Sequence, residues 1–553
     1  MRIRRLIAAV CFFPFAGCGT AQMEQGTIFT GTVVVGEEQT PRAGYAVYVH
    51  DGLIRDVGPA AAVTAAHRGA RLVETGGTIL PGLVDAHAHL YGLGLALDTV
   101  SLTGTRSLDE VVQRVRDRLA TAAPDEWILG RGWDQNQWPV QEFPTAAPLD
   151  AAVGDRPVWL RRVDGHAALA SSAAMRAAGI TAATPDPPGG RILRDAEGKP
   201  TGVFIDAAMA LVERIVPPVS FEQRKRHVLA SAQRIARNGL TAIHDAGADG
   251  ETIRAVRELI DEGRFPIRVY VMLGDNEALL REWFARGPLL DYGGRLTVRS
   301  VKLYADGALG SRGAALLEPY SDDPGNRGLM IASTGHMTDV ARRARAAGFQ
   351  VNTHAIGDAG VRNVLDAYEA AGVQQQDRFR IEHLQVVAPS DFARLARRGV
   401  IASMQPTHAT SDMYWAEARL GPERVRGAYA WRTVLDSGGR LALGSDFPVE
   451  EVNPWLGIYA AVTRRDQKGW PEKGWYPGQR LTLAEAIRGF TRDAAFAAFE
   501  ETRSGSIEPG KLADLTIVEE NPYAVSPDAL DEVRVKYTVV GGEIVYLAAG
   551  AGR

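Results

Sequence analysis

The chain has 553 residues, 46 % of them hydrophobic and 23 % charged, which is the composition of a globular protein and not of a disordered or fibrous one. A formal net charge of −4, without a basic tract, argues against nucleic acid as the main partner. Two cysteines exclude a disulfide framework and a metal site built from cysteine, so the chemistry must come from His, Asp, Glu, Lys or hydroxyl groups.

Residues 1–20 are predicted to be a signal peptide. Arginines within the first five residues precede an apolar stretch at 6–15, which is too short to span a bilayer as a helix but suits a secretory signal. The stretch ends in Phe15-Ala-Gly-Cys18, which resembles the bacterial lipoprotein box. We therefore expect export and a lipid anchor at Cys18 on a bacterial membrane, facing the periplasm or the exterior. The alternative is an ordinary secretory signal cut near Ala21.

From about residue 76 onwards, β-branched runs alternate with amphipathic stretches rich in Ala, Arg and Leu. This alternation is typical of βα units around a parallel sheet. The spacing from the second strand to the eighth predicts an α/β fold, a (β/α)8 TIM barrel over residues 77–503. The predicted strands are Thr78–Asp85, Leu240–Asp245, Ile267–Leu273, Val298–Tyr304, Phe349–His354, Arg378–His383, Val400–Gln405 and Arg440–Ser445.

The gap between the first and second predicted strands is far too long for one βα repeat. We interpret residues 92–215 as a large insertion with a small structure of its own. An insertion after strand one of a barrel emerges at the C-terminal face, so this one is expected to roof the active site.

The two chain ends, 24–76 and 504–548, are rich in short alternating strands and turns. Neither end alone is long enough for a stable sheet. We therefore expect them to pair into one small β-sandwich beside the barrel, with two unrelated arms as the alternative.

Polar residues at strand ends carry the chemistry. His87 and His89 follow the first predicted strand at i and i+2, a spacing that points both imidazoles to the same side and lets them reach one ion. The strand ends of a barrel converge on one mouth, so six polar residues there predict a metal site and not scattered core or surface histidines. The other four lie in or just after predicted strands four, five, six and eight, and are Lys302, His354, His383 and Asp446.

These motifs resemble the amidohydrolase superfamily, specifically the amidohydrolase-3 branch that includes N-substituted formamide deformylases. The resemblance runs along nearly the whole mature chain. It includes Gly505-Ser-Ile-Glu-Pro-Gly-Lys-Leu-Ala-Asp514, which looks like the segment that completes the accessory β-sandwich of the superfamily. The resemblance implies two divalent metal ions. His87 and His89 would bind the more buried ion, and His354 and His383 the more exposed one.

The resemblance also implies roles for Lys302 and Asp446. Lys302 matches a lysine that is often carboxylated to bridge the two ions, and Asp446 matches an aspartate that touches the metal and handles protons. A carbamate is an anionic oxygen donor, whereas a free ammonium is repelled by the ions. The alternative for Lys302 is a surface or substrate-binding lysine beside a mononuclear site. Ligation by His and carboxylate suits zinc, while manganese, iron or cobalt fit the same shell.

Two such ions would bridge a hydroxide, lower its pKa and polarise a substrate carbonyl. Asp446 would accept the hydroxide proton during attack and pass it to the leaving amine. We therefore predict an enzyme that hydrolyses non-peptide C–N bonds of the amide, N-acyl or N-formyl type in a small-molecule substrate. The alternatives are a lactonase, esterase or phosphoesterase using the same site, and a non-catalytic binding lipoprotein that keeps the fold. A homo-oligomer is an option that the sequence leaves open.

Five residues are candidates for the substrate pocket, each with a structural alternative. His166 and Trp133 lie in the insertion and resemble family motifs, with a turn and a core tryptophan as the alternative for Trp133. Asp306 follows Lys302 and is expected to ligate a substrate oxygen or, alternatively, to order its own loop. His408 follows strand seven, with a plain loop role as the alternative. His244 ends strand two, where we prefer a structural role beside the site to a contact with substrate.

Overall fold

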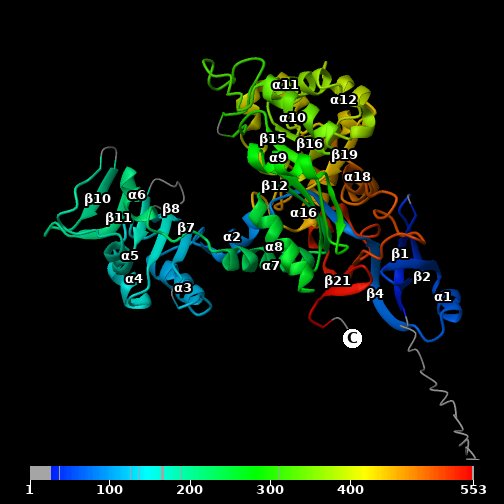
Figure 1. The fold of residues 1–553 in the computed structure, drawn as a ribbon, viewed down its shortest axis with the longest axis horizontal. Helices are drawn as coiled ribbons and strands as arrows, with labels where there is room; N and C mark the ends of the chain where they lie inside the picture. Colours follow the sequence, from blue (N-terminus) through cyan, green and yellow to red (C-terminus); the bar gives the residue numbers. More distant parts are fainter. Residues whose placement is uncertain are drawn as a thin grey trace, which may run out of the picture.

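The computed structural model describes residues 26–36, 38–124, 126–135, 138–162, 167–187, 190–310 and 312–550. The predicted signal peptide, Cys18 and His166 lie outside these residues. Figure 1 shows three parts: a barrel, a β-sheet unit that contains the C-terminal strands, and a separate lobe built from the insertion. Within the described residues, no helix is long and apolar enough to cross a membrane.

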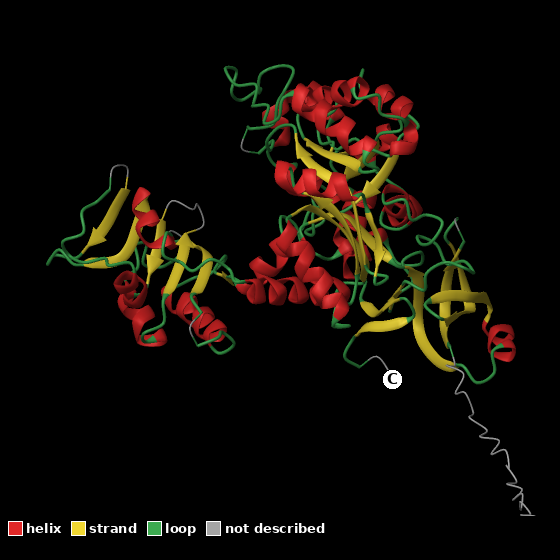
Figure 2. Ribbon diagram, in the orientation of Figure 1, coloured by secondary structure: helices red, strands yellow, loops and turns green. Residues whose placement is uncertain are grey.

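The barrel predicted from the strand spacing is confirmed. Its strands run parallel to their neighbours and are surrounded by helices (Figure 2). In order around the barrel they are β5 (Leu83–Ala88), β12 (Leu240–Ala248), β13 (Arg268–Leu273), β15 (Leu296–Tyr304), β16 (Gln350–Ala355), β17 (Arg380–His383), β18 (Ile401–Met404) and β19 (Arg440–Leu443).

The last and first strands are joined just beyond their ends. The backbone N–H of Asp446 donates to the carbonyl of His87 at 2.8 Å, and that of His89 donates to the carbonyl of Phe447 at 3.0 Å. The barrel is therefore closed at its C-terminal end, by the same residues that carry the candidate ligands.

Helices cover the outside of the barrel because each presents an apolar stripe to the sheet. In α7 (Phe221–Arg237), the Ser220 side chain caps the first turn and Gln223 completes a capping box, while Val228, Ala232 and Ile235 face the core. The remaining helices of this part are α8 (Gly250–Asp261), α9 (Glu277–Arg286), α10 (Thr334–Ala346), α11 (Asp358–Ala370), α12 (Phe392–Arg398), α13 (Pro406–Asp412), α14 (Ala416–Arg424), α15 (Trp431–Asp436), α16 (Pro454–Thr463), α17 (Leu483–Gly489) and α18 (Arg492–Ala497).

The first predicted strand, Thr78–Asp85, is wrong as a single element. The chain forms β4 (Arg71–Pro81) in another sheet and then β5 in the barrel, with the change at Gly82. The Gly82 N–H donates to the carbonyl of Asp514 at 2.8 Å, and a side chain there would collide with Thr241. The Pro81-Gly82 pair marks the break, but the apolar residues on both sides read as one strand because burial in two different cores leaves the same hydrophobic pattern.

Strands from both chain ends lie in one seven-stranded sheet. Its order is β22-β21-β20-β4-β1-β2-β3, and β20 pairs antiparallel with β4 at Thr516 and Leu80. The sheet and its helix consist of β1 (Thr27–Val35), β2 (Thr40–His50), β3 (Leu53–Pro59), α1 (Ala60–Ala66), β4, β20 (Leu515–Val518), β21 (Val535–Val540) and β22 (Glu543–Leu547).

The insertion folds around a sheet of its own, with the order β10-β11-β9-β8-β7-β6 and a separate apolar core that includes Val115, Ile128 and Leu160. It contains β6 (Val100–Ser101), α3 (Leu108–Leu119), β7 (Ile128–Trp133), α4 (Ala146–Val153), β8 (Val158–Arg162), β9 (Ala167–Ala170), α5 (Ser172–Ala177), β10 (Gly190–Arg194), β11 (Pro200–Asp206) and α6 (Ala210–Glu213).

The inserted lobe is joined to the barrel through α2 (Leu90–Asp98) and the segment before α7 (Figure 1). Asp98, the last residue of α2, forms ion pairs with Arg118 of the lobe and with His227 of α7 at 2.9 Å. In Figure 1 the lobe stands beside the barrel. That it roofs the active site stays a prediction.

The sheet made from the chain ends is held to the base of the barrel by a buried ion pair. Arg268 at the start of β13 donates to both carboxylate oxygens of Asp514, at 2.7 and 2.9 Å, and the two side chains are only 12 % and 8 % exposed. A buried pair of this kind is costly to break because the remaining partner keeps an uncompensated charge.

We expect Asp514→Ala to lower the free energy of unfolding by about 3–5 kcal/mol, because Arg268 stays buried without its partner. Urea denaturation followed by circular dichroism measures the change. Glu543→Ala is the control, since Glu543 is 77 % exposed and its pair with Arg295 should contribute less than about 1 kcal/mol. Equal losses in the two variants would show that the buried pair does not hold the sheet to the barrel.

Candidate metal centre

Three buried side chains at the mouth of the barrel present ligand atoms to one another. One such atom each from His87, His383 and Asp446 lies within 4.8 Å of the other two, and the residues are at most 7 % exposed. His87 lies near the end of β5, His383 is the last residue of β17, and Asp446 follows β19. The Asp446 Oδ1 atom is 3.4 Å from His87 Nε2.

The other three predicted ligands lie around this group. His89 Nε2 is 2.9 Å from Asp446 Oδ1, and the ring centroids of His354 and His383 are 4.6 Å apart. Lys302 Nζ lies 3.3 Å from His87 Nε2. The structure thus brings all six side chains together at the C-terminal ends of five strands, because parallel strands in a barrel end at one mouth.

Three of the candidate histidine ligands form a hydrogen bond through Nδ1 with a protein oxygen. His87 Nδ1 is hydrogen-bonded to Glu382 Oε2, His89 Nδ1 to the carbonyl of Ala246 at 2.9 Å, and His383 Nδ1 to Gln405 Oε1 at 2.9 Å. Carboxylate and carbonyl oxygens only accept hydrogen bonds, so Nδ1 donates in each case. His383 thereby keeps its Nε2 lone pair for a ligand, the arrangement that is usual around protein-bound metals. The Nε2 atoms of His87 and His89 face Asp446 Oδ1 and coordinate a metal only when they carry no proton.

Burial keeps the imidazoles of His354 and His383 in the neutral form that binds metal ions. Burial, followed by the charge of Lys302, lowers the pKa of His354 to about 3, and burial holds the pKa of His383 well below its usual value. Both rings are therefore neutral at pH 7. Burial alone would raise the pKa of Asp446, but hydrogen bonds from His87 and His89 outweigh it, and the carboxyl group stays ionised.

Two further histidine nitrogen atoms at the site are available to bind a cation. The buried Nε2 atoms of His354 and His408 have no hydrogen-bond partner among the described residues. Unpartnered buried polar atoms are rare in proteins and call for an unseen partner. Neutral imidazoles with an ionised carboxylate are a donor set that suits zinc and related divalent ions. The residues therefore fit the metal ions expected from the sequence.

Two of the five predicted substrate residues make structural contacts, although Asp306 Oδ1 is only 3.8 Å from His354 Nε2. The Asp306 carboxylate is fully buried and accepts hydrogen bonds from the backbone N–H groups of Ile356, Gly357 and Ala315 at 2.8–2.9 Å. This favours the alternative, in which Asp306 orders the loops after β15 and β16. Trp133 is buried in the inserted lobe and donates to the carbonyl of Leu160 at 2.8 Å, which favours the core-tryptophan alternative.

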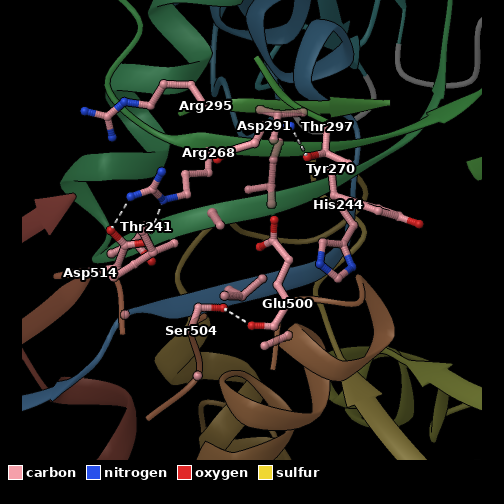
Figure 3. Close-up of a pocket in the computed structure, with 18 of the residues that line it drawn as sticks. Thr241, His244, Arg268, Tyr270, Asp291, Arg295, Thr297, Glu500, Ser504 and Asp514 are labelled. Atoms are coloured by element: carbon pink, nitrogen blue, oxygen red, sulfur yellow. Dashed lines mark hydrogen bonds and ion pairs between the residues drawn. The ribbon is translucent and has the colours of Figure 1, made fainter. Parts of the chain in front are cut away.

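His244 lies inside the barrel, below the mouth. Its Nδ1 atom accepts a hydrogen bond from Arg380 at 2.9 Å, and the ring lines a cavity of about 30 Å³ at the base of the barrel. Figure 3 shows this cavity, with the Arg268–Asp514 pair on one side, His244 and Tyr270 on the other, and Glu500 between them. The position agrees with the structural role preferred for His244.

His408 does reach the mouth. Its Nε2 atom is 3.7 Å from Asp446 Oδ2 and 4.0 Å from Glu450 Oε1, and its ring stacks on that of His383 with centroids 5.9 Å apart. His166 lies outside the described residues, so its expected contact with substrate stays a prediction.

Sequence reasoning missed four residues that support the centre: Glu382, Arg380, Gln405 and Asp85. The Asp85 carboxylate accepts from the backbone N–H of His87 at 3.0 Å and from the hydroxyl of Ser445 at 2.6 Å, and so ties β5 to the segment after β19. The signal for Arg380 and Glu382 was available, since two charged residues flank Ile381 in a short strand of the barrel interior.

Comparison with known proteins decides the family. The family model described as "Amidohydrolase family" matches residues 75–546. The chain belongs to the amidohydrolase family. An amidohydrolase of Bacillus subtilis, YtcJ, is 35 % identical to this family member over 512 residues, which cover 91 % of the present chain and 96 % of the relative.

Two further relatives agree in length and in structure. The N-substituted formamide deformylase of Arthrobacter pascens is 28 % identical over 525 residues, covering 92 % of this amidohydrolase and 95 % of the relative. The crystal structure of an uncharacterised metal-dependent hydrolase from Pyrococcus horikoshii superposes with a TM-score of 0.74 at 26 % identity, covering 91 % of this chain and 99 % of that one. The resemblance stated from the motifs is thereby confirmed, and the chain is placed in a superfamily of metal-dependent hydrolases.

We expect His383→Ala to weaken zinc binding at least about 100-fold, because loss of a direct ligand should exceed the about 10- to 100-fold effect of losing an outer partner. Zinc titration of the chelator-treated protein, with elemental analysis, measures this. His336→Ala is the control, since His336 is exposed and pairs only with Asp275 in the described structure. A variant that binds zinc as tightly as the control would remove His383 from the ligand set.

Proposed function

We propose that this amidohydrolase cleaves a non-peptide C–N bond of the amide, N-acyl or N-formyl type in a small molecule, with Asp446 as the proton shuttle. The observation that carries the proposal is the contact of an ionised, buried Asp446 with two histidines at the mouth of the barrel. The printed name of the Arthrobacter relative, a formamide deformylase, supports this bond type.

We propose that His87, His89, His354, His383, Lys302 and Asp446 hold two divalent ions, for which zinc suits the donors. When bound, such ions supply Lewis acidity that activates water and polarises a carbonyl group. The protein supplies the rest: imidazoles facing inward, an ionised carboxylate, and buried surroundings that keep these groups in place.

Lys302 suits carboxylation. Its side chain is 1 % exposed, and burial lowers the pKa of the amine to about 8, so the uncharged fraction at neutral pH is minor but far larger than for a lysine in water. An uncharged amine attacks carbon dioxide to form a carbamate, with release of one proton, and so exchanges a cation for an anion. Asn352, in register with Lys302 on β16, has both amide atoms unpartnered among the described residues. The Asn352 amide group is therefore available as a hydrogen-bond donor for the carbamate, at the same level of the barrel as Lys302.

Asp446 has the position and the charge for proton transfer. One carboxylate oxygen contacts His87 and His89, while Oδ2 faces His408. During hydrolysis, the carboxylate would accept a proton from water as its oxygen bonds to the acyl carbon. It would then deliver that proton to the nitrogen as the C–N bond breaks, so that acid and amine leave the site.

The proposal is tested by assaying the zinc-loaded protein on N-formyl and N-acyl amines and amino acids, with lactones, esters and phosphoesters as the second arm. We expect turnover in the first arm. Activity confined to the second arm would replace the C–N assignment by the lactonase, esterase or phosphoesterase alternative. A zinc-loaded protein inactive in both arms would favour the non-catalytic binding role.

We expect Asp446→Asn to lower kcat by about 10²–10⁴, because an amide does not accept and release the proton. The variant is assayed on the best substrate of the screen, after elemental analysis of its zinc content. If the variant holds as much zinc as the unsubstituted protein and keeps its kcat, Asp446 is not the proton shuttle.

For Lys302, we expect the change Lys302→Met to reduce the zinc content from two ions per chain to one or none, because the added carboxylate is lost. Reloading the unsubstituted protein should require bicarbonate, while the variant should not respond to it. Lys225→Met is the control, since Lys225 is also buried but pairs with Glu258 and Glu262 outside the barrel mouth. Two zinc ions per chain in Lys302→Met would exclude the bridging carbamate.

A further inference from the structure

A column of buried polar side chains lies inside the barrel, beneath the candidate ligands. Glu382 and Arg380 come from β17, His244 from β12 and Ser403 from β18, and each is at most 2 % exposed. Charged residues are almost never buried to this extent unless they are paired. None of these four side chains has a part in the chemistry proposed above, so their presence needs a separate explanation.

At the top of the column, Glu382 joins His87 to Arg380. One carboxylate oxygen accepts the Nδ1–H of His87, and the other forms an ion pair with Arg380 Nε at 2.7 Å. Both side chains are fully buried, so the guanidinium and the carboxylate are charged partners with no access to solvent. Glu382 is therefore an anion in the core of the barrel, and its position is set by Arg380.

Arg380 is in turn held from three other strands. It donates to His244 Nδ1 on β12 and to the Ser403 hydroxyl on β18, each at 2.9 Å, and to the carbonyl of Ala86 on β5. His244 can accept at Nδ1 only when that atom carries no proton. Burial and the adjacent guanidinium keep its pKa well below the usual value, so the ring is neutral. The guanidinium plane is thus fixed by contacts that leave it little freedom to rotate.

We propose that Glu382 is a positioning residue for metal binding, and that Arg380 and His244 act through it. An anionic acceptor at Nδ1 fixes the tautomer and the ring plane of His87, so that the Nε2 lone pair faces the other ligands, and it makes that nitrogen a stronger donor. The inference rests on the proposed function in one respect, namely that His87 binds metal.

A purely structural role for the column predicts something different. Removing Glu382 would then destabilise the metal-free protein without changing the intrinsic affinity for metal. The two roles are separated by measuring zinc affinity and unfolding of the metal-free protein on the same variants. The visible absorption spectrum of the cobalt-substituted protein gives a third measurement, because it reports the ligand field of the bound ion and is independent of activity.

The first variant is Glu382→Gln, which keeps the size of the side chain but not its charge. We expect about 10- to 100-fold weaker zinc affinity and an altered cobalt spectrum. Glu501→Gln is the matched control, because Glu501 also pairs with an arginine of the same segment, Arg378, but lies at the base of the barrel, away from the ligands. We expect the control to bind zinc like the unsubstituted protein.

Since Glu382→Gln leaves Arg380 as an unpaired buried cation, the variant is open to misfolding. The double variant Arg380→Met with Glu382→Met removes both charges, and replacement of a buried pair by apolar side chains is often neutral for stability. We expect this protein to fold and to show the same loss of zinc affinity.

Unchanged zinc affinity and cobalt spectrum in a folded variant would overturn the inference. Failure of the unsubstituted protein to bind any divalent ion would instead overturn the proposed function, and the inference with it.

Discussion

The backbone hydrogen bond from Asp446 to the carbonyl of His87 joins the last strand of the barrel to the first. The same contact brings the Asp446 carboxylate to His87 and His89, so the closure of the barrel also assembles the site. Asp85 reinforces the contact by accepting from His87 and Ser445. A site built this way is sensitive to the closure of the barrel, since an open seam would separate the carboxylate from its histidines.

The candidate ligands also mark where the backbone is strained. His383 has a φ of +70° and Asp446 a φ of +64°, in the left-handed region that side chains with a Cβ atom disfavour. Each such residue costs on the order of 1–3 kcal/mol and persists only where the surroundings determine it. His383 is the last residue of β17 and Asp446 follows β19, so both lie where the chain leaves a strand at the mouth of the barrel.

Charge balance is the second constraint on this barrel. Lys302, Arg380, Glu382 and Asp446 are all buried in or just above its interior. The charges of Arg380 and Glu382 compensate each other. Lys302 has no carboxylate hydrogen-bonded to its amine in the described structure, and burial lowers the pKa of that amine to about 8. Conversion of this amine to an anion, together with binding of cations, would leave each buried charge with a partner of opposite sign.

The barrel and the ligand candidates follow from patterns in the sequence. The period of βα units predicted seven strands within a few residues of β12, β13 and β15–β19, because parallel strands buried on both faces leave clear apolar runs. It also singled out His87, His89, Lys302, His354, His383 and Asp446, since polar residues at strand ends stand out from such runs.

The other features of the site depend on contacts between segments that are distant in sequence. The division of the first run at Gly82 depends on which core each half enters, and the use of Asp306 depends on three N–H groups from loops that are distant in sequence. The Arg380–Glu382–His87 column likewise joins β17 to β5 across the barrel. Local patterns report which side chains are buried, but not which other buried groups they meet, because hydrogen bonds and ion pairs form between strands whose neighbours are chosen by the whole fold.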